Sequence, residues 1–281
     1  IAELEEAPRD LYTGAVGWVA PGGDCRFNVA IRSFELRPDG EASLGVGSGI
    51  VIDGDPRSEY AECLLKARFI REFDPGFELI ETLRLEDGRY PLLPLHLGRL
   101  GRSARCLGFA LDAKAVEAAL FELAVRHASG VFRVRLSLAH GGTFRLQAAP
   151  LDMAQTSWRF VLADELLPDG DFLRAHKTTV RGRYDKALAG LSGDVFDVVF
   201  FNRRGEVCEG ARSNVFVVRD GVWLTPPLAS GLLPGVMRQH LLDSGRAVEQ
   251  VSTRDDLLGA SAVYLVNALR GVIPVQYAEA D

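Results

Sequence analysis

Three features between His176 and Arg238 have residue types that suit one kind of chemistry. Lys177 stands in a polar stretch, Glu209 lies at the edge of an apolar strand farther along, and a glycine-rich turn precedes Arg238. A lysine amine can form a Schiff base with an aldehyde, and a carboxylate can keep a pyridine nitrogen protonated. Backbone N–H groups at a helix N-terminus can bind a phosphate. Together these groups are what an enzyme needs to hold pyridoxal phosphate.

Each residue also has an ordinary interpretation, since a lysine in a polar stretch or a glutamate on a strand edge is usually a solvated charge. The surrounding motifs favour a role in cofactor chemistry for these residues. Glu209 begins the pattern E-x-x-x-x-N-x-F, and residues 225–238 contain T-P-P-L followed by G-x-L-P-G-x-x-R. Across roughly residues 75–281 the sequence resembles the class IV (fold type IV) pyridoxal-phosphate enzymes, which include branched-chain and D-amino-acid transaminases and aminodeoxychorismate lyase.

The resemblance implies roles for the residues of a cofactor site. Lys177 matches the catalytic lysine that forms the Schiff base, and Glu209 matches the partner of the pyridine nitrogen. Val236 and Met237 match the phosphate-binding turn. Arg99, in the sequence LHLGRL, matches a phosphate-binding arginine, a role that suits its guanidinium fork. The ordinary alternative for Arg99 is a place on a solvated basic helix face.

Four further positions match the family's active site but have a second interpretation. Tyr184 matches a tyrosine that reaches the ring oxygen of the cofactor, although its spacing from Lys177 varies in the family. Thr82 falls where the lyase carries an active-site threonine, and it is also a good strand former. Asn267 and Ala268 match a loop that contacts phosphate or substrate, while Asn267 could instead end a strand as a turn residue. Some transaminases carry a threonine in place of Ala268, so that side-chain contact is lost here.

The elements that must position these residues follow from apolar periodicity. Phe77–Leu85 and Arg89–Leu93 predict a β-hairpin, and His96–Leu107 predicts the helix that carries Arg99. A second hairpin is predicted over residues 131–147, with arginines alternating on its wet or functional face. We therefore expect an α+β fold with the two-domain fold type IV architecture. Its expected parts are a small domain at 74–148, a linker at 149–157 and a large cofactor-binding domain at 158–281.

Residues 1–73 are organised separately. Tyr12–Val19, Phe27–Phe34 and Ala42–Ile52 predict β-strands, and Asp55-Pro56 predicts the start of an amphipathic helix. The glycines at 45, 47 and 49 do not indicate a dinucleotide site, because that motif needs a helix directly after the glycine turn. Here the strand is expected to continue through Ile52. We expect a partial antiparallel β/α segment.

This segment resembles the C-terminal end of chorismate-utilising enzymes such as anthranilate synthase and aminodeoxychorismate synthase component I. The matching motifs are YTGAVG, FNVAIR, GSGIV and DGDP. The resemblance implies substrate-binding roles for Tyr12, Arg32, Gly47, Ser48 and Gly49. Glu62 would ligate magnesium with Glu59 beside it, as suits carboxylates on one helix face. The alternative is a solvated acidic face plus a structural arginine. Only part of that domain is matched, so we expect an incomplete site that would need the full domain to bind magnesium.

Composition excludes several other classes. The 281 residues are 47% hydrophobic and 25% charged, as in a globular protein with a core. A net charge of −6 argues against a nucleic-acid partner. No apolar run approaches the roughly 18–20 residues that span a bilayer, so we expect no membrane partner. Four scattered cysteines and five scattered histidines favour reduced thiols in a cytoplasmic protein over disulfides or a zinc site.

The resemblances together imply an aminodeoxychorismate lyase that converts 4-amino-4-deoxychorismate to 4-aminobenzoate and pyruvate in folate biosynthesis. Met237 stands where transaminases more often carry threonine, and the preceding segment resembles the synthase that makes the lyase's substrate. The first alternative is a branched-chain or D-amino-acid transaminase, and the second is a non-catalytic chorismate-binding scaffold. We expect a homodimer, and a glutamine amidotransferase partner if the full component I is present.

Overall fold

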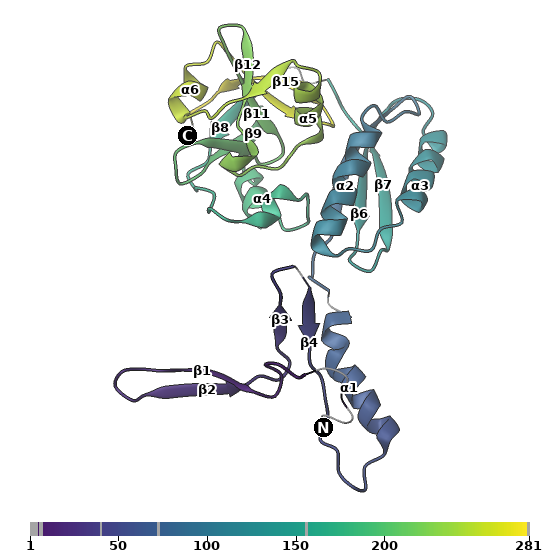
Figure 1. Ribbon diagram of the computed structural model, residues 1–281. Coiled ribbons are helices and arrows are strands. Elements are labelled where there is room, and N and C mark those ends of the chain that lie inside the picture. Colours follow the sequence, from purple (N-terminus) through teal and green to yellow (C-terminus); the bar gives the residue numbers. More distant parts are fainter. Residues whose placement is uncertain (1–4, 6–7, 40, 72–73, 155–156, 280–281) are drawn as a thin grey trace. The chain divides into compact units, whose positions relative to one another are not determined.

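The structure is a computed structural model that describes residues 5, 8–39, 41–71, 74–154 and 157–279. The chain forms two compact units, Ile1–Asp74 and Pro75–Asp281 (Figure 1). Each unit is described by itself below.

The first unit contains two small hairpins and one helix. Its elements are β1 (Ala15–Val19), β2 (Cys25–Val29), β3 (Phe34–Leu36), β4 (Ala42–Leu44) and α1 (Pro56–Arg71). β1 pairs with β2, and β3 pairs with β4, both antiparallel. The predicted start of the helix is confirmed, because Asp55 accepts a hydrogen bond from the backbone N–H of Ser58 at 2.9 Å. In the described part of this unit Ala30 is the one buried hydrophobic residue, and large apolar residues such as Trp18 and Tyr60 are exposed.

The strand predicted over Ala42–Ile52 is wrong beyond Leu44. Residues 45–50 have no regular structure, and residues 52–53 form a turn. The alternating glycines explain the difference, since glycine weakens a strand interior. A Cβ atom on Gly45 would lie 2.3 Å from the ring of Tyr12, so this stretch packs closely against an aromatic side chain. The strand predicted over Phe27–Phe34 is also interrupted, because the backbone of Arg32 adopts a φ of 54°.

The second unit begins with a three-stranded antiparallel sheet and two helices. Its elements are β5 (Leu79–Glu86), α2 (Leu93–Leu107), α3 (Ala113–Arg126), β6 (Val131–Leu138) and β7 (Phe144–Pro150). β5 pairs with β6, and β6 pairs with β7. One face of the sheet packs with both helices around a core that includes Leu83, Leu120 and Leu136. The predicted second hairpin is therefore confirmed.

The hairpin predicted between Phe77–Leu85 and Arg89–Leu93 is wrong. Glu86 and Arg89 do exchange two backbone hydrogen bonds of 2.9 Å across a tight turn. The chain then enters α2 instead of a second strand, with a proline in the first turn of the helix. A proline has no N–H to donate to a strand ladder but is well tolerated at the start of a helix.

A large sheet occupies the rest of the second unit. Its strands are β8 (Trp158–Leu162), β9 (Val195–Phe201), β10 (Val207–Gly210), β11 (Asn214–Arg219), β12 (Val222–Thr225), β13 (Ala247–Glu249), β14 (Ala262–Asn267) and β15 (Gly271–Tyr277). Their order is β10-β9-β8-β15-β14-β11-β12-β13, and β10 also pairs with β11. That additional pairing closes six strands into a ring, which we call the barrel.

Three helices flank the barrel strands: α4 (Gly182–Leu188), α5 (Val236–Asp243) and α6 (Arg254–Leu258). Phe160, Val215 and Leu265 belong to the main barrel core. α5 packs through Leu241 onto a separate cluster that includes Phe216 and Val266. None of the helices in the described part of the chain is both long and apolar enough to cross a membrane.

We expect residues 75–281, produced without the first unit, to unfold in one cooperative thermal transition. The reason is that this unit contains its own buried clusters. Residues 1–74 alone should show no cooperative transition, because their described part buries so little apolar surface. Circular dichroism at rising temperature would measure both. A sharp transition in the isolated first unit would contradict this expectation.

Candidate active site

Lys177 is held at the edge of the small sheet. Its carbonyl oxygen accepts a hydrogen bond of 2.8 Å from the N–H of Ile80 in β5. Thr178 bridges to Leu79, and the N–H of Thr179 donates to the carbonyl of Glu78 at 2.9 Å. A short polar segment therefore joins β5 as an extra edge. This pairing fixes the backbone on both sides of the lysine.

Glu209 lies where the barrel closes. Glu209 in β10 and Asn214 in β11 are the register partners of that pairing. Both side chains contact the backbone of Leu233: its N–H donates to Glu209 Oε2 at 2.8 Å, and its carbonyl accepts from Asn214 Nδ2 at 2.9 Å. The E-x-x-x-x-N motif thus has a direct structural reason, since the two side chains bind the N–H and the C=O of the same residue.

A buried carboxylate that the sequence interpretation missed holds the turn between these two residues. Asp197 in β9 is fully buried. It accepts hydrogen bonds from Ser213 Oγ at 2.6 Å and from the N–H of Arg212 at 3.1 Å. Burial raises the pKa of Asp197 to about 6, against the opposing effect of these hydrogen bonds. The available signal was a lone acid within the otherwise apolar run VFDVVFF.

Arg99 lies in a buried ionic cluster on α2. Its Nε and Nη2 donate to the two oxygens of Glu81 at 2.8 and 2.6 Å, and its Nη1 donates to the carbonyl of Pro234 at 3.2 Å. His96 Nδ1 lies 2.7 Å from Glu81 Oε2. Burial alone would raise the pKa of Glu81, but Arg99 and His96 hold it well below its usual range. Arg99 is therefore not on the solvated basic face, and three of its five N–H groups are used.

The N-terminus of α5 lies beside Arg99. Gly235 is its N-cap residue, and no side chain caps the helix. A Cβ atom on Gly235 would lie 1.9 Å from Asn214 Oδ1, so only glycine fits between the barrel and the helix. Val236 faces a large cavity. The side chain of Met237 lies instead beside a smaller cavity and packs against the α5 cluster.

The large cavity has a volume of about 460 Å³, within the roughly 300–1,000 Å³ of small-molecule sites. It brings together most of the residues expected in the second unit, namely Thr82, Arg99, Lys177, Tyr184, Glu209, Val236, Asn267 and Ala268. It also contains six arginines that the site prediction did not include, namely Arg133, Arg135, Arg174, Arg181, Arg183 and Arg212. Alternation in β6 was the signal for the first two of these.

The cavity shifts the titration of its central groups toward neutrality. Burial lowers the pKa of Lys177 to about 8, assisted by Arg99 and Arg181. Burial raises the pKa of Glu209 to about 7, although hydrogen bonds from Tyr184 and Leu233 favour the ionised form. An amine and a carboxylate that both titrate near pH 7–8 can exchange protons at physiological pH.

Two expected contact residues are already engaged within the chain. Tyr184 donates its hydroxyl hydrogen to Glu209 Oε1 at 2.7 Å, and burial raises its pKa. The side-chain oxygen of Asn267 accepts from the N–H groups of Leu269 at 3.1 Å and Arg270 at 2.8 Å. Asn267 thus forms the strand-ending turn that was its alternative interpretation, while still lining the cavity.

The first unit brings some of its expected residues together. A Cβ atom on Gly47 would lie 2.7 Å from the hydroxyl of Tyr12. The Nζ of Lys66 donates to the carbonyl of Gly47 at 2.9 Å. Ser48 Oγ is buried without a hydrogen-bond partner. Tyr12 and the glycine turn are therefore neighbours, as the resemblance implies.

The expected magnesium ligands do not form a cluster. Glu62 pairs with Lys66 at 3.0 Å, so its charge is balanced within the helix. Among the described residues, no group of three or more acidic, histidine or cysteine side chains could hold a metal. Arg32 is exposed, as is Gly49. The unit by itself supplies part of a site at most.

Comparison with known proteins decides the family of the second unit. The family model "Amino-transferase class IV" matches residues 78–277. The chain belongs to this family. A Schizosaccharomyces pombe protein whose name proposes an aminodeoxychorismate lyase is 31% identical over 202 residues, covering 69% of this chain and 87% of that protein. The crystal structure of a proposed amino-acid aminotransferase from Mesorhizobium loti is 40% identical, with a TM-score of 0.68, covering 72% of this chain and all of that one.

The first unit resembles a second family. The family model "chorismate binding enzyme" matches residues 1–72 of the chain. Aminodeoxychorismate synthase component 1 of Bacillus subtilis is 43% identical over 67 residues, which are 24% of this chain and 14% of that protein. The chain thus spans only a small part of this relative. Both predicted resemblances, and the α+β class IV fold, are confirmed.

We expect Lys177 to react with amine reagents at lower pH than ordinary lysines. Its reactivity should rise through about pH 8, because burial and the neighbouring arginines favour the neutral amine. Competitive labelling with acetic anhydride, read by mass spectrometry, would measure this against the exposed Lys114. A parallel pH dependence of the two lysines would contradict the electrostatic description of the cavity.

Proposed function

We propose that this class IV family member is a pyridoxal-phosphate-dependent aminodeoxychorismate lyase, which converts 4-amino-4-deoxychorismate to 4-aminobenzoate and pyruvate. The observation that carries the cofactor is the presence of Lys177 and Glu209 in one cavity. The observation that carries the reaction is the adjoining chorismate-binding segment.

The residues of the cavity fit pyridoxal phosphate. The uncapped N-terminus of α5 and the remaining N–H groups of Arg99 suit a phosphate. Lys177 supplies an amine with a pKa of about 8, and Glu209 supplies a buried carboxylate for the pyridine nitrogen. The close approach of Gly235 to Asn214 holds the helix start at the barrel. We assign Arg99, Lys177, Glu209 and Val236 to cofactor binding, with Tyr184 supporting Glu209.

The charge of the cavity suits the proposed substrate, which carries two carboxylates. Arg133 and Arg135 lie on the open face of β6, where no ion pair formed by the described residues includes them. Thr82 is the register partner of Arg135. A guanidinium binds a carboxylate through two parallel hydrogen bonds. These arginines are therefore candidates for the substrate carboxylates, beside the cofactor's own phosphate site.

The family likeness supports the same choice. The Schizosaccharomyces pombe relative carries the lyase name, and the first unit matches enzymes that act on chorismate. Aminodeoxychorismate is the product of such an enzyme, so joining the two segments would join consecutive steps. A transaminase gains nothing comparable from that neighbour.

The chain's own groups would then act as follows. When bound, pyridoxal phosphate would accept an amine at its aldehyde carbon and withdraw electrons from the carbon that bears the amine. Lys177 Nζ would hold the cofactor between turnovers and, once released, remove the proton from that ring carbon. Glu209 would hold a proton at the pyridine nitrogen. As the C–O bond to the side chain breaks and the ring becomes aromatic, Lys177 would protonate the departing enolpyruvate to give pyruvate.

A transaminase is the second candidate. The 40% identity to the Mesorhizobium loti protein, a proposed amino-acid aminotransferase, favours it. The cofactor-holding residues do not separate the two reactions, because both use the same ones. The difference lies in what happens to the cofactor. A transaminase leaves it in the amine form and needs a keto acid to return, whereas a lyase restores the aldehyde in every turnover.

We expect borohydride to fix the pyridoxyl group on the peptide that contains Lys177. Lys177→Ala should still bind the cofactor through Arg99 and α5 but without a covalent link, and turnover should fall by at least about a thousandfold, because the proposed base is lost. Peptide mapping by mass spectrometry would locate the label. Labelling of the exposed Lys186 instead would overturn the assignment.

With aminodeoxychorismate and no keto acid, we expect many equivalents of pyruvate per site. Alanine, leucine or D-amino acids should convert the cofactor to its amine form only slowly. A lactate dehydrogenase assay for pyruvate and the cofactor's absorbance would measure the two outcomes. Rapid conversion by an amino acid, with no pyruvate from aminodeoxychorismate, would establish the transaminase instead.

A further inference from the structure

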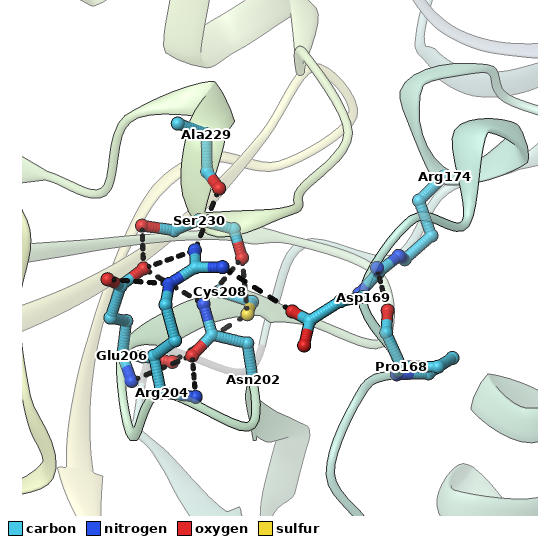
Figure 2. Close-up of polar contacts among 9 residues, drawn as sticks. All are labelled: Pro168, Asp169, Arg174, Asn202, Arg204, Glu206, Cys208, Ala229 and Ser230. Carbon is cyan, nitrogen blue, oxygen red and sulfur yellow. Dashed lines mark hydrogen bonds and ion pairs between the residues drawn. The ribbon is translucent and has the colours of Figure 1, made fainter.

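The turn between β9 and β10 contains a dense polar network outside the cavity lining. Glu206 is its centre (Figure 2). Its Oε2 accepts from Arg204 Nη2 at 2.8 Å, from Asn202 Nδ2 at 2.9 Å and from Ser230 Oγ at 2.8 Å. Its Oε1 accepts from Arg204 Nε at 3.0 Å. One carboxylate thus gathers donors from its own turn and from a distant loop.

The network fastens the loop that leads to α5. Arg204 Nη2 donates to the carbonyl of Ala229 at 2.9 Å, and Asn202 Nδ2 donates to the carbonyl of Ser230 at 3.1 Å. The thiol of Cys208 donates to the same carbonyl at 3.0 Å. Three residues later the chain reaches Leu233, whose backbone contacts Glu209. The loop is therefore fixed at two points before it enters the phosphate-binding helix.

The network also reaches the segment that leads to Lys177. Arg204 Nη1 lies 3.4 Å from Asp169 Oδ1. Leu167 bridges to Asn202, and Arg174 donates from Nη2 to the carbonyl of Pro168. Figure 2 shows Asp169 pointing toward Arg204, with Arg174 and Pro168 on the other side of it. The β9–β10 turn is thus the common attachment of two segments, 167–174 and 228–233.

We propose that Glu206 is a positioning residue for the cofactor site, which sets the two segments that lead to Lys177 and to the N-terminus of α5 relative to Glu209. The inference rests on the proposed function, since it concerns the hold on pyridoxal phosphate. Glu206 is three residues before Glu209 on the same hairpin. Any shift of either segment at this turn changes the distances among the amine, the carboxylate and the phosphate-binding N–H groups.

The network needs the negative charge of Glu206. Its pKa is lowered to about 2, mainly by the hydrogen bond from Arg204 and also by those from Asn202 and Ser230. A carboxylate offers only acceptors, which match these donors. A glutamine of the same shape would present an NH₂ group to at least one of them. Glu206→Gln therefore breaks the network with little change in volume.

The other end of β9 supplies a matched control. Asp194 accepts from Arg159 at 2.6 Å and from Ser192 Oγ at 2.8 Å, and those hydrogen bonds lower its pKa too. Asp194 does not line the cavity. Asp194 directly precedes β9, so Asp194→Asn removes a similar hydrogen-bonded carboxylate from the other end of that strand without touching either segment.

The test is an equilibrium titration of the full chain, cleared of cofactor, with pyridoxal phosphate, followed by the rate of cofactor release. We expect Glu206→Gln to weaken binding about tenfold or more through faster release, and Asp194→Asn to change it less than twofold. Ser230→Ala, which removes a single donor, should weaken binding in the same direction by a smaller factor. Thermal melts of the cofactor-free proteins measure any general loss of stability.

The inference would be overturned if Glu206→Gln and Ser230→Ala both bound the cofactor as tightly as the parent chain does. Losses of affinity in Asp194→Asn as large as those in Glu206→Gln would also overturn it, since the role would then be general stability. If Glu206→Gln does not fold, Ser230→Ala alone decides. Failure of the parent chain to bind pyridoxal phosphate would instead refute the proposed function, and with it the basis of the inference.

Discussion

In the second unit, the backbone of one residue, Leu233, is hydrogen-bonded on both its N–H and its C=O by side chains of the barrel. Leu233 donates its N–H to Glu209 and accepts from Asn214 at the single register pair where β10 meets β11. The pairing of Glu209 with Asn214 closes the barrel, and their two hydrogen bonds to Leu233 orient the Glu209 carboxylate and anchor the loop that leads to α5. Backbone N–H and C=O groups that are withdrawn from water need hydrogen-bond partners, so an apolar residue in place of Glu209 or Asn214 would remove the partner of one of the two Leu233 groups. The closure of the barrel and the position of the Glu209 carboxylate thus depend on the same residues.

The cavity keeps several ionisable groups away from water. Each of them either has a close partner of opposite charge or has its pKa shifted by burial. Arg99 is paired with Glu81, which in turn contacts His96. Lys177 and Glu209 lack so close a partner of opposite charge, and burial moves their pKa values toward neutrality. Desolvation disfavours the charged form of any group unless another charge or hydrogen bond offsets it. Lys177, the group proposed for proton transfer, is thus left to titrate near pH 8, while Arg99, proposed to hold the phosphate, is paired with Glu81.

Much of the second unit could be predicted from the sequence, because its motifs are local. Glu209 and Asn214 are five residues apart, and the glycine turn precedes α5 directly. The missed features depend on tertiary contacts. The residues of Arg89–Leu93 are typical of a strand, so they were expected to pair with β5. In the structure β6 pairs with β5, and a proline follows at the start of α2. Asp197 gave no motif of its own, since its side-chain donor Ser213 is distant in sequence. Glu206 draws donors from its own turn, but its contact with Ser230 depends on the tertiary fold. In the first unit, alternating glycines under Tyr12 ended a strand that apolar periodicity extended.

The distribution of arginines bears on the choice between the two reactions. A cofactor phosphate needs one cationic corner, which Arg99 and the start of α5 supply in the proposed function. A branched-chain amino acid would add one carboxylate and an apolar side chain, for which a cavity needs one further cation and an apolar wall. The open face of β6 instead presents Arg133 and Arg135, with Arg181 and Arg212 also lining the cavity. Arg181 is paired with Asp185, but no ion pair of the described residues includes Arg133 or Arg135. Like charges repel one another, so these two arginines are most stable beside a ligand with more than one negative charge. The two arginines on β6 thus add support to the proposed lyase, whose substrate carries two carboxylates.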